Sequence, residues 1–375
     1  MITKIEIKNF KAHRETSLDL KNLTILSGIN GVGKSSIFQV LLLLRQSYES
    51  NMLQEGLQLN EPHCYIGNIE DAIYQFAEDD IISFSIEAEP KKICKWNFSL
   101  KKNNLTGDYI PAIEHNSTDY SLNIFNDNFQ YLSASRMVKN KIHSFAVESK
   151  KRLSLEKGQA ELVAQFLYYW GKEKKIKVFS DYLLNPLMLS ASDLLSQTTA
   201  WEREISPNVN VMPVKVGNSY EIKYSFNKQG DVTNEFSSDN VGFGLTYALP
   251  IIVAILSSQK DSLLLIENPE AHLHPRGQSK LAELIALAAQ AGIQIILETH
   301  SDHIINGILV ACKKFENNGK GIDRNLVKIY HFTRDEEKHC AIPNPINILQ
   351  DGKIDTQPEG FFDQTENDLN YLLGF

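Results

Sequence analysis

The segment Gly28-Ile-Asn-Gly-Val-Gly-Lys-Ser35 decides the fold, because it fits the pattern GxxxxGK[ST] at every fixed position. The apolar run 23–26 before it is typical of a buried strand, and the leucine-rich segment 35–48 after it has the length of a buried helix. The glycines let backbone N–H groups converge on phosphate oxygens, and the helix adds the positive end of its dipole. Strand, glycine-rich turn and helix together predict a site for a nucleoside triphosphate.

Two side chains of this segment are expected to act on the phosphates directly. Lys34 is placed to reach the β- and γ-phosphates, and Ser35 is placed to bind Mg²⁺. The full set of expected nucleotide-binding residues in this segment is Gly28, Asn30, Gly31, Gly33, Lys34, Ser35 and Ser36.

An acid follows a later apolar strand. Residues 263–266 are all apolar and lead directly into Glu267, with Asn268 and Glu270 just after it. A carboxylate at the tip of a buried parallel strand beside a phosphate-binding loop is where the Mg²⁺ shell is completed. Glu267 is therefore the expected metal ligand alongside Ser35.

A histidine follows the next apolar strand. The segment 293–297 leads into Glu298, Thr299, His300 and Ser301. A histidine beside the acid-bearing strand can hydrogen-bond a γ-phosphate or an attacking water, so His300 is a candidate catalytic residue.

A second glycine-rich segment, 238–245, opens an apolar helix. Its residues Asn240, Gly242 and Gly244 would stand at an anion-friendly helix N-terminus. One phosphate loop needs only one such cradle, so a second is most simply explained by action in trans on another protomer. An ordinary glycine turn before a core helix is the alternative.

Composition limits the class of protein. The 375 residues are 42% hydrophobic and carry a net charge of −8, which fits a globular protein and excludes a uniformly basic nucleic-acid coat. The four cysteines stand far apart without a CxxC pair, which favours reduced thiols. The N-terminus lacks an apolar signal region, and the longest apolar run, around 245–256, is too short to span a bilayer. We expect a cytoplasmic protein without membrane contact.

A basic segment lies in the middle of the chain. Between Lys139 and Val178 there are ten Lys or Arg residues and four Glu residues, with aromatic residues at 168–170. This pattern could serve a nucleic-acid contact, but a solvated helical face whose aromatics pack on the protein is the favoured interpretation.

The motifs, in this order, resemble the ABC-type ATPase heads of the SMC, RecF and OLD group, and more closely an uncharacterised branch of small prokaryotic AAA-family ATPases. The resemblance is carried by IKNFKAH (7–13), GINGVGKSS (28–36, as Walker A), YLSASR (131–136), DNVGFGL (239–245, as signature), LLLIENPEAHLHP (263–275, as Walker B with D-loop), ILETHSDHII (296–305) and PEGFFDQTENDLNYLL (358–373).

The resemblance implies an α/β fold, a P-loop ABC-type head with a mixed sheet flanked by helices. It also implies an inserted helical and β subdomain and no long coiled coil. The expected divisions are a head lobe at 1–138, a basic helical insertion at 139–208, and a second head lobe at 209–375. Only 75 residues follow His300 and they carry no DxD pair, so no nuclease domain is expected.

The resemblance further implies a homodimer that sandwiches two ATP molecules with Mg²⁺, and it leaves a higher oligomer open. Gly242 and Gly244 would face the partner's γ-phosphate, His300 would be the switch histidine, and Lys11 would touch the nucleotide. Glu267 would stand where most relatives have the Walker B Asp.

One departure from the family pattern concerns catalysis. Many ABC-type heads have a catalytic Glu directly after the Walker B acid, whereas this sequence has Asn268. An amide can orient water but cannot accept a proton as a carboxylate does. Either Glu270 or Glu267 takes the role of the base, or hydrolysis is slow and the ATP-bound dimer long-lived.

Three functions follow as hypotheses. The first is an ATP-hydrolysing dimer switch that controls a separate effector protein, with anti-phage defence as the implied setting. The second is a RecF-like, ATP-dependent DNA clamp that uses the basic segment. The third is an ATP-locked structural scaffold, suggested by Asn268.

Overall fold

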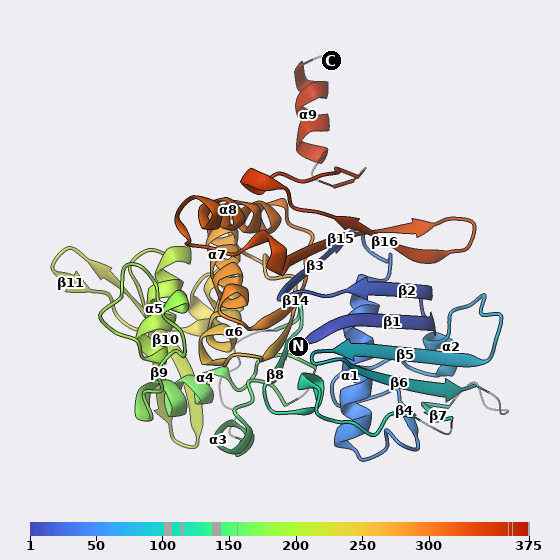
Figure 1. Ribbon diagram of the computed structural model, residues 1–375. Coiled ribbons are helices and arrows are strands. Elements are labelled where there is room, and N and C mark those ends of the chain that lie inside the picture. Colours follow the sequence, from blue (N-terminus) through green and yellow to red (C-terminus); the bar gives the residue numbers. More distant parts are fainter. Residues whose placement is uncertain are drawn as a thin grey trace. The chain divides into compact units, whose positions relative to one another are not determined.

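The computed structural model describes residues 1–100, 107–113, 116–136, 144–155, 157–358, 360–361 and 363–373 (Figure 1). The chain divides into two units. Unit 1 comprises Met1–Phe125, Glu298–Asp302 and Asp323–Phe375, and unit 2 comprises Asn126–Leu297 and His303–Ile322. Each unit is described by itself.

Unit 1 contains a four-stranded antiparallel sheet in the order β2-β1-β5-β6, whose strands lie side by side in Figure 1. Apolar residues such as Ile5 and Ile7 are buried while Glu6 and Lys8 between them are more exposed, which is the period of a half-buried strand. The strands are β1 Ile2–Phe10, β2 His13–Asp19, β5 Ile81–Ala88 and β6 Lys92–Ser99.

A second set of strands in unit 1 supports the glycine-rich segment. Strand β3 (Leu23–Gly28) pairs in parallel with β15 (Val327–Asp335), which pairs antiparallel with β16 (Cys340–Ile346). Helix α1 (Lys34–Glu49) follows β3 and buries its run of leucines at 41–44. The predicted strand and helix around the motif are therefore both present.

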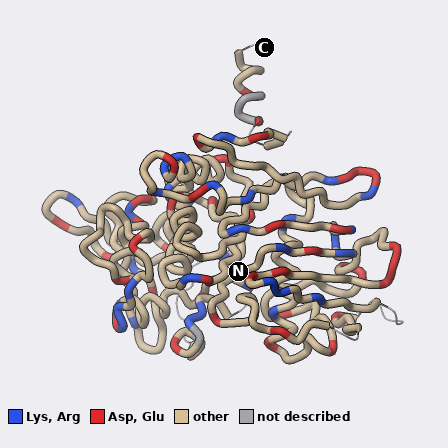
Figure 2. Tube along the Cα trace, in the orientation of Figure 1, with Lys and Arg blue, Asp and Glu red and all other residues tan. Residues whose placement is uncertain are grey.

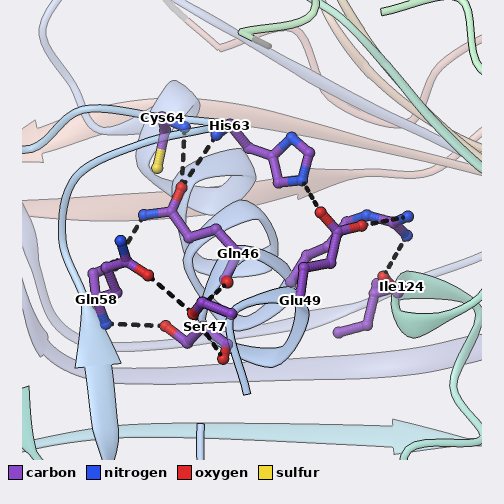
Figure 3. A network of polar contacts seen from close by, with 9 residues as sticks. Gln46, Ser47, Glu49, Gln58, His63, Cys64 and Ile124 are labelled. Carbon is purple, nitrogen blue, oxygen red and sulfur yellow. Dashed lines mark hydrogen bonds and ion pairs between the residues drawn. The ribbon is translucent and has the colours of Figure 1, made fainter. Parts of the chain in front are cut away.

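A polar network fastens the chain after α1 onto that helix (Figure 3). The buried Gln46 side chain accepts hydrogen bonds from the backbone N–H groups of His63 and Cys64, and its amide donates to the carbonyl of Gln58 at 2.8 Å. His63 Nε2 lies 2.8 Å from Glu49, at the end of α1. These contacts replace backbone pairing that the irregular loop lacks.

Unit 1 also contains several shorter elements. They are the β4–β7 pair (Gly56–Gln58 with Tyr109–Pro111), helix α2 (Ile69–Ala72), helix α9 (Gln364–Leu373), and 3-10 turns at Asn123–Phe125, Arg324–Leu326 and Gln350–Gly352.

Unit 2 is built on parallel strands in the order β14-β13-β8, covered by long helices. The strands are β8 (Phe129–Leu132), β13 (Leu263–Glu267) and β14 (Gln294–Glu298), whose last residue belongs to unit 1. The helices are α6 (Phe243–Ser257), α7 (Pro275–Gln290) and α8 (Asp302–Asn318). The fully apolar strand β13 is the expected pattern for a parallel strand buried on both faces.

The remainder of unit 2 is a helical and β region before α6. Its hairpin pairs Val209–Val216 with Ser219–Lys228 through a turn at Gly217, which has a φ of +60°. Its elements are α3 (Ala146–Lys150), α4 (Val163–Phe166), a π-helix (Leu167–Glu173), a 3-10 turn (Asp181–Leu183), α5 (Leu194–Ile205), β9 (Val209–Val216), β10 (Ser219–Lys228), β11 (Asp231–Val232), β12 (Phe236–Ser237) and a 3-10 turn (Ser238–Asn240).

The helices and cysteines of the described residues bear on several of the sequence-based expectations. The described part of the basic segment has α-helices at Ala146–Lys150 and Val163–Phe166, and the longest described helix, α8, has 17 residues, far short of a coiled-coil arm. All four cysteines are free, as expected for reduced thiols. Within the described residues, no helix is both long and apolar enough to cross a membrane. Part of the basic segment, residues 139–143 and 156, lies outside the described residues, and the three-part division of the chain stays a prediction.

Candidate nucleotide-binding site

The phosphate loop, residues 28–36, links the end of β3 to the start of α1 in unit 1. Gly28, Gly31 and Gly33 have φ values of +131°, +80° and +102°, a region that L side chains rarely adopt. Gly33 caps the N-terminus of the 16-residue α1, so the free N–H groups of the helix face the loop. The backbone therefore has the curl that phosphate binding requires.

Lys34 and Ser35 meet an acid from a distant part of the chain. Ser35 Oγ donates to Glu298 Oε1 at 2.9 Å, and Lys34 Nζ lies 4.0 Å from the same oxygen. Lys34 Nζ also donates to the carbonyls of Gly28 at 2.9 Å and Ile29 at 2.7 Å. The lysine is thus held over its own loop, where it could exchange carbonyl partners for phosphate oxygens.

Glu298 has no role in the sequence-based prediction, although the signal for it was present. It directly follows an apolar strand, as Glu267 does, and the two positions could not be told apart by pattern. Only the folded chain shows that Glu298 is the acid in hydrogen-bond contact with Ser35.

The His13 side chain contacts the backbone of the phosphate loop at Gly33. Its Nε2 lies 3.0 Å from the Gly33 carbonyl and its Nδ1 lies 2.9 Å from Thr16 Oγ1, so Nε2 carries the proton and Nδ1 accepts from the hydroxyl. Burial lowers the pKa of His13 to about 4, against the smaller opposing effect of the Gly33 carbonyl. A second contact to the loop comes from the Arg334 guanidinium, which donates to the Gly31 carbonyl.

We expect the stability of the protein to fall between pH 7 and pH 5 because of His13. Its pKa is about 4 when folded against 6.5 for the ordinary group, so unfolding takes up a proton in that window and stability drops as pH falls. The expected loss is about 2 kcal/mol at pH 5. In urea unfolding at the two pH values, His13→Gln should remove this part of the pH dependence, and an unchanged dependence would contradict the assignment.

Lys11 and His300 both lie in unit 1. Lys11 has a φ of +51°, and its Nζ donates to Gln39 on α1 at 3.1 Å. Burial lowers the pKa of Lys11, while Cys64 and Asp71 act in the opposite direction. His300 is exposed directly after Thr299, whose N–H donates to the Leu26 carbonyl of β3. A nucleotide contact for Lys11 and a catalytic role for His300 stay predictions.

In unit 2, one carboxylate oxygen of Glu267 has a partner on β8 and the other has a partner on the segment just after β8. The Tyr131 hydroxyl donates to Oε1 at 2.8 Å, and the Ala134 N–H donates to Oε2 at 3.0 Å. Glu267 is half-buried at the end of β13. Its carboxylate therefore orders the chain that follows β8, a role the sequence-based prediction lacks.

Arg136 clamps the same region through the backbone. Its guanidinium is fully buried and donates to the carbonyls of Ser133 (3.0 Å), Tyr247 (3.1 Å), Glu267 (2.5 Å) and Asn268 (2.9 Å). Burial lowers the pKa of Arg136 to about 10, although the nearby Glu270 and Glu267 raise it. Four carbonyl partners are what allow a cation to be buried here.

The backbone explains the departure at Asn268. This residue has a φ of +42°, in the left-handed region where Asn is several-fold enriched over other non-glycine residues. Its carbonyl is held by Arg136. Glu270 lies half-buried two residues further on. The roles of Asn268 and Glu270 in hydrolysis stay predictions.

The two signature glycines differ in their surroundings. Gly242 caps the N-terminus of α6, and a Cβ there would meet nothing within 4 Å. Gly244 lies inside the first turn of α6 rather than ahead of it, and a Cβ there would stand 3.0 Å from the His272 carbonyl. The His272 ring in turn packs against Phe243 and Tyr247. Gly244 is thus needed for close packing, whereas Gly242, like Asn240, faces open space.

The oxygen donors fit the expected cation. Within unit 1, the Ser35 hydroxyl and the Glu298 carboxylate stand together at the phosphate loop, and both are the hard ligands that Mg²⁺ selects. Bound there with a nucleotide, Mg²⁺ would neutralise phosphate charge.

Three family models match the chain in succession. The model described as "AAA ATPase domain" matches residues 1–179, and the one described as "AAA domain, putative AbiEii toxin, Type IV TA system" matches residues 172–306. A third, "Protein of unknown function (DUF3696)", matches residues 322–372.

Two relatives point to the same group. The Old nuclease of Escherichia phage P2 is 23% identical over 413 residues, covering 95% of this chain and 68% of that protein. The DNA replication and repair protein RecF of Acholeplasma laidlawii (strain PG-8A) is 33% identical over 75 residues, which are 19% of this chain and 22% of RecF. The chain is therefore similar to ATPases of the SMC, RecF and OLD group.

The fold of the chain is similar to that of solved SMC heads. An SMC head bound to the C-winged helix domain of ScpA has a TM-score of 0.52 at 14% identity, covering 92% of this chain and 98% of the other. An SMC head with an extended coiled coil, bound to the C-terminal domain of ScpA derived from Pyrococcus furiosus, has a TM-score of 0.52 at 13% identity, covering 99% of both chains. The predicted α/β head with a mixed sheet flanked by helices is confirmed.

Proposed function

We propose that this ATPase binds ATP with Mg²⁺ at the phosphate loop and hydrolyses it. We further propose that ATP closes two copies of the chain into a dimer, and that this dimer controls a separate effector protein. The single observation that carries the proposal is the phosphate loop itself. Three left-handed glycines, the N-terminus of α1, Lys34 and Ser35 are gathered there as triphosphate binding requires.

The dimer follows from the signature segment. Gly242 stands exposed at the N-terminus of the 15-residue α6, with open space where a Cβ would be. Such a terminus attracts anions through free N–H groups and the helix dipole. We infer that it meets the γ-phosphate held by a second copy, and that Asn240 lies at the same interface. In this arrangement His300 would monitor the γ-phosphate, and Glu267 or Glu270 would supply the base with Asn268 orienting water.

The test is ATP-dependent dimerisation, measured by analytical ultracentrifugation with Mg²⁺ and a slowly hydrolysed ATP analogue. We expect the wild type to change from monomer to dimer and Lys34→Ala to remain monomeric because it cannot hold the triphosphate. Gly242→Val should bind the analogue as the wild type does but fail to dimerise. The φ of −59° at Gly242 suits any residue, and an added Cβ meets no atom of the chain within 4 Å.

Other outcomes would separate the rival functions. A dimer that forms equally in Gly242→Val would contradict the trans arrangement, and wild-type affinity in Lys34→Ala would contradict the phosphate site. Steady-state hydrolysis by the wild type, with and without duplex DNA, completes the comparison. Turnover unchanged by DNA supports control of a protein effector, and turnover raised by DNA supports a clamp. Tight binding without turnover supports a scaffold.

The described part of the basic segment argues against the DNA clamp. Lys151, Lys172 and Lys174 lie over the rings of Trp170, Tyr168 and Tyr169 at 4.9 to 5.3 Å, so these aromatics have cation partners within the chain. Acidic and basic residues are interspersed along the trace of both units (Figure 2). We propose anti-phage defence as the setting of the switch; a match to a phage protein and a match to a family model that names a toxin–antitoxin system support this proposal.

A further inference from the structure

The phosphate loop has an acidic partner that the sequence pattern did not single out. We propose that Glu298, rather than Glu267, is the carboxylate that completes the Mg²⁺ site beside Ser35. This inference rests on the proposed ATP binding and names a further residue of that same site.

The first argument is the geometry at the loop. Glu298 Oε1 accepts from Ser35 Oγ at 2.9 Å and lies 4.0 Å from Lys34 Nζ. Glu298 is only 5% exposed and Lys34 only 3% exposed. In P-loop NTPases the cation is held between the loop's hydroxyl and an acid within its reach. Glu298 is an acid in direct contact with that hydroxyl.

The second argument is that the backbone holds Glu298 in place. The next residue, Thr299, donates its N–H to the carbonyl of Leu26 at 3.1 Å, two residues before the loop begins. Glu298, Leu26 and the loop all belong to unit 1. The carboxylate is therefore positioned by the same strand that positions the loop, which is the rigidity a metal site needs.

The third argument concerns the competing acid. Both oxygens of Glu267 accept hydrogen bonds, from Tyr131 at 2.8 Å and from the Ala134 N–H at 3.0 Å. Arg136 holds the backbone carbonyl of Glu267 at 2.5 Å. A carboxylate engaged in this way is oriented toward the end of β8 and the segment that follows it. We assign Glu267 as a positioning residue for residues 131–136.

The negative charge of Glu298 should have opposite effects on two affinities, strengthening the binding of Mg²⁺ and weakening the binding of metal-free ATP. Mg²⁺ is bound through one or two carboxylates together with water and phosphate oxygens. Removing the negative charge of Glu298 should therefore weaken the cation. The same change removes repulsion between the carboxylate and the phosphates, so metal-free ATP should bind equally well or more tightly. A purely structural role for Glu298 would instead weaken both.

The experiment measures equilibrium binding of a fluorescent ATP analogue in EDTA and in Mg²⁺. Glu298→Gln keeps the volume and an oxygen that can accept from Ser35. We expect it to reduce the Mg²⁺ enhancement of affinity by about 10- to 100-fold, with no loss of metal-free affinity. Glu87→Gln, the same change at an acid on β5 of unit 1, is the matched control and should keep the enhancement within about twofold. Electron paramagnetic resonance with Mn²⁺ and ADP should show the bound ion lost in Glu298→Gln only.

The remaining outcomes overturn one proposal or the other. If Glu298→Gln keeps the full Mg²⁺ enhancement, or loses metal-free and metal-dependent affinity together, the assignment of Glu298 is wrong while ATP binding stands. If the wild type binds no better than Lys34→Ala, the proposed function itself fails. Glu298→Asp keeps the negative charge and replaces Glu298→Gln in the experiment if the Gln variant does not fold. Glu298→Asp should retain more of the Mg²⁺ enhancement than Glu298→Gln does. Complete loss of metal-free affinity in Glu298→Asp would overturn the assignment.

Discussion

Arg136→Met is expected to destabilise unit 2 by about 3 to 5 kcal/mol, enough to unfold a marginally stable unit. The substitution keeps an unbranched apolar stem of similar reach but removes every donor. The carbonyls of Ser133, Tyr247, Glu267 and Asn268 then lose the guanidinium that satisfies them. Each buried acceptor left without a partner costs about 1 to 3 kcal/mol.

Urea unfolding followed by circular dichroism measures this effect. Arg276→Met is the matched control, because Arg276 is exposed on α7 in the same unit. Its cost should stay within about 0.5 kcal/mol. Equal midpoints for the two variants would mean that Arg136 does not anchor the end of β13 and the start of α6. Arg136→Lys should fall between them, since one ammonium reaches fewer carbonyls at once.

Gly28→Ala is the second large effect, with an expected cost of about 2 to 5 kcal/mol together with loss of ATP binding. Gly28 has a φ of +131° and is paired with Phe332 of β15. A Cβ at this position would lie 2.4 Å from the Phe332 carbonyl oxygen, a backbone atom that cannot move without separating the strands. The loop would have to shift, and its N–H groups would no longer converge.

The control for Gly28→Ala isolates the steric part of the cost. Gly230 also has a positive φ, of +75°, but a Cβ there meets nothing within 4 Å. Gly230→Ala therefore bears only the conformational cost, about 1 kcal/mol, and should leave ATP binding unchanged. Equal destabilisation of the two variants in urea, or normal ATP binding by Gly28→Ala, would contradict the close approach of β3 and β15.

Local patterns were sufficient for most of the fold. The apolar run 23–26 before the glycines is part of β3, and the leucine-rich segment 35–48 after them lies in α1. These features depend on neighbours within a few residues, so periodicity and turn chemistry predict them. The basic segment was less predictable, since its described part has two short α-helices, Ala146–Lys150 and Val163–Phe166, and the second continues as a π-helix.

Some residues of the candidate site were likewise predictable from the sequence, and others were not. Lys34 and Ser35 are defined by a contiguous motif, and the structure gives both of them contacts at the phosphate loop. The acid was not predictable, because Glu267 and Glu298 each follow an apolar strand and the pattern favoured the first. His13 and Arg136 were also missed as supports, since their partners lie 20 and up to 132 residues away in sequence.

The sequence by itself determined that this chain has a phosphate loop and that it resembles ABC-type heads. A loop of this kind is made from consecutive residues whose φ angles, helix dipole and side chains are local properties. The tertiary structure alone decided which acid meets Ser35 and what surrounds each signature glycine. Those contacts depend on how strands distant in sequence are aligned. Alignment is set by packing and hydrogen bonds summed over each whole unit, which no single stretch of residues contains.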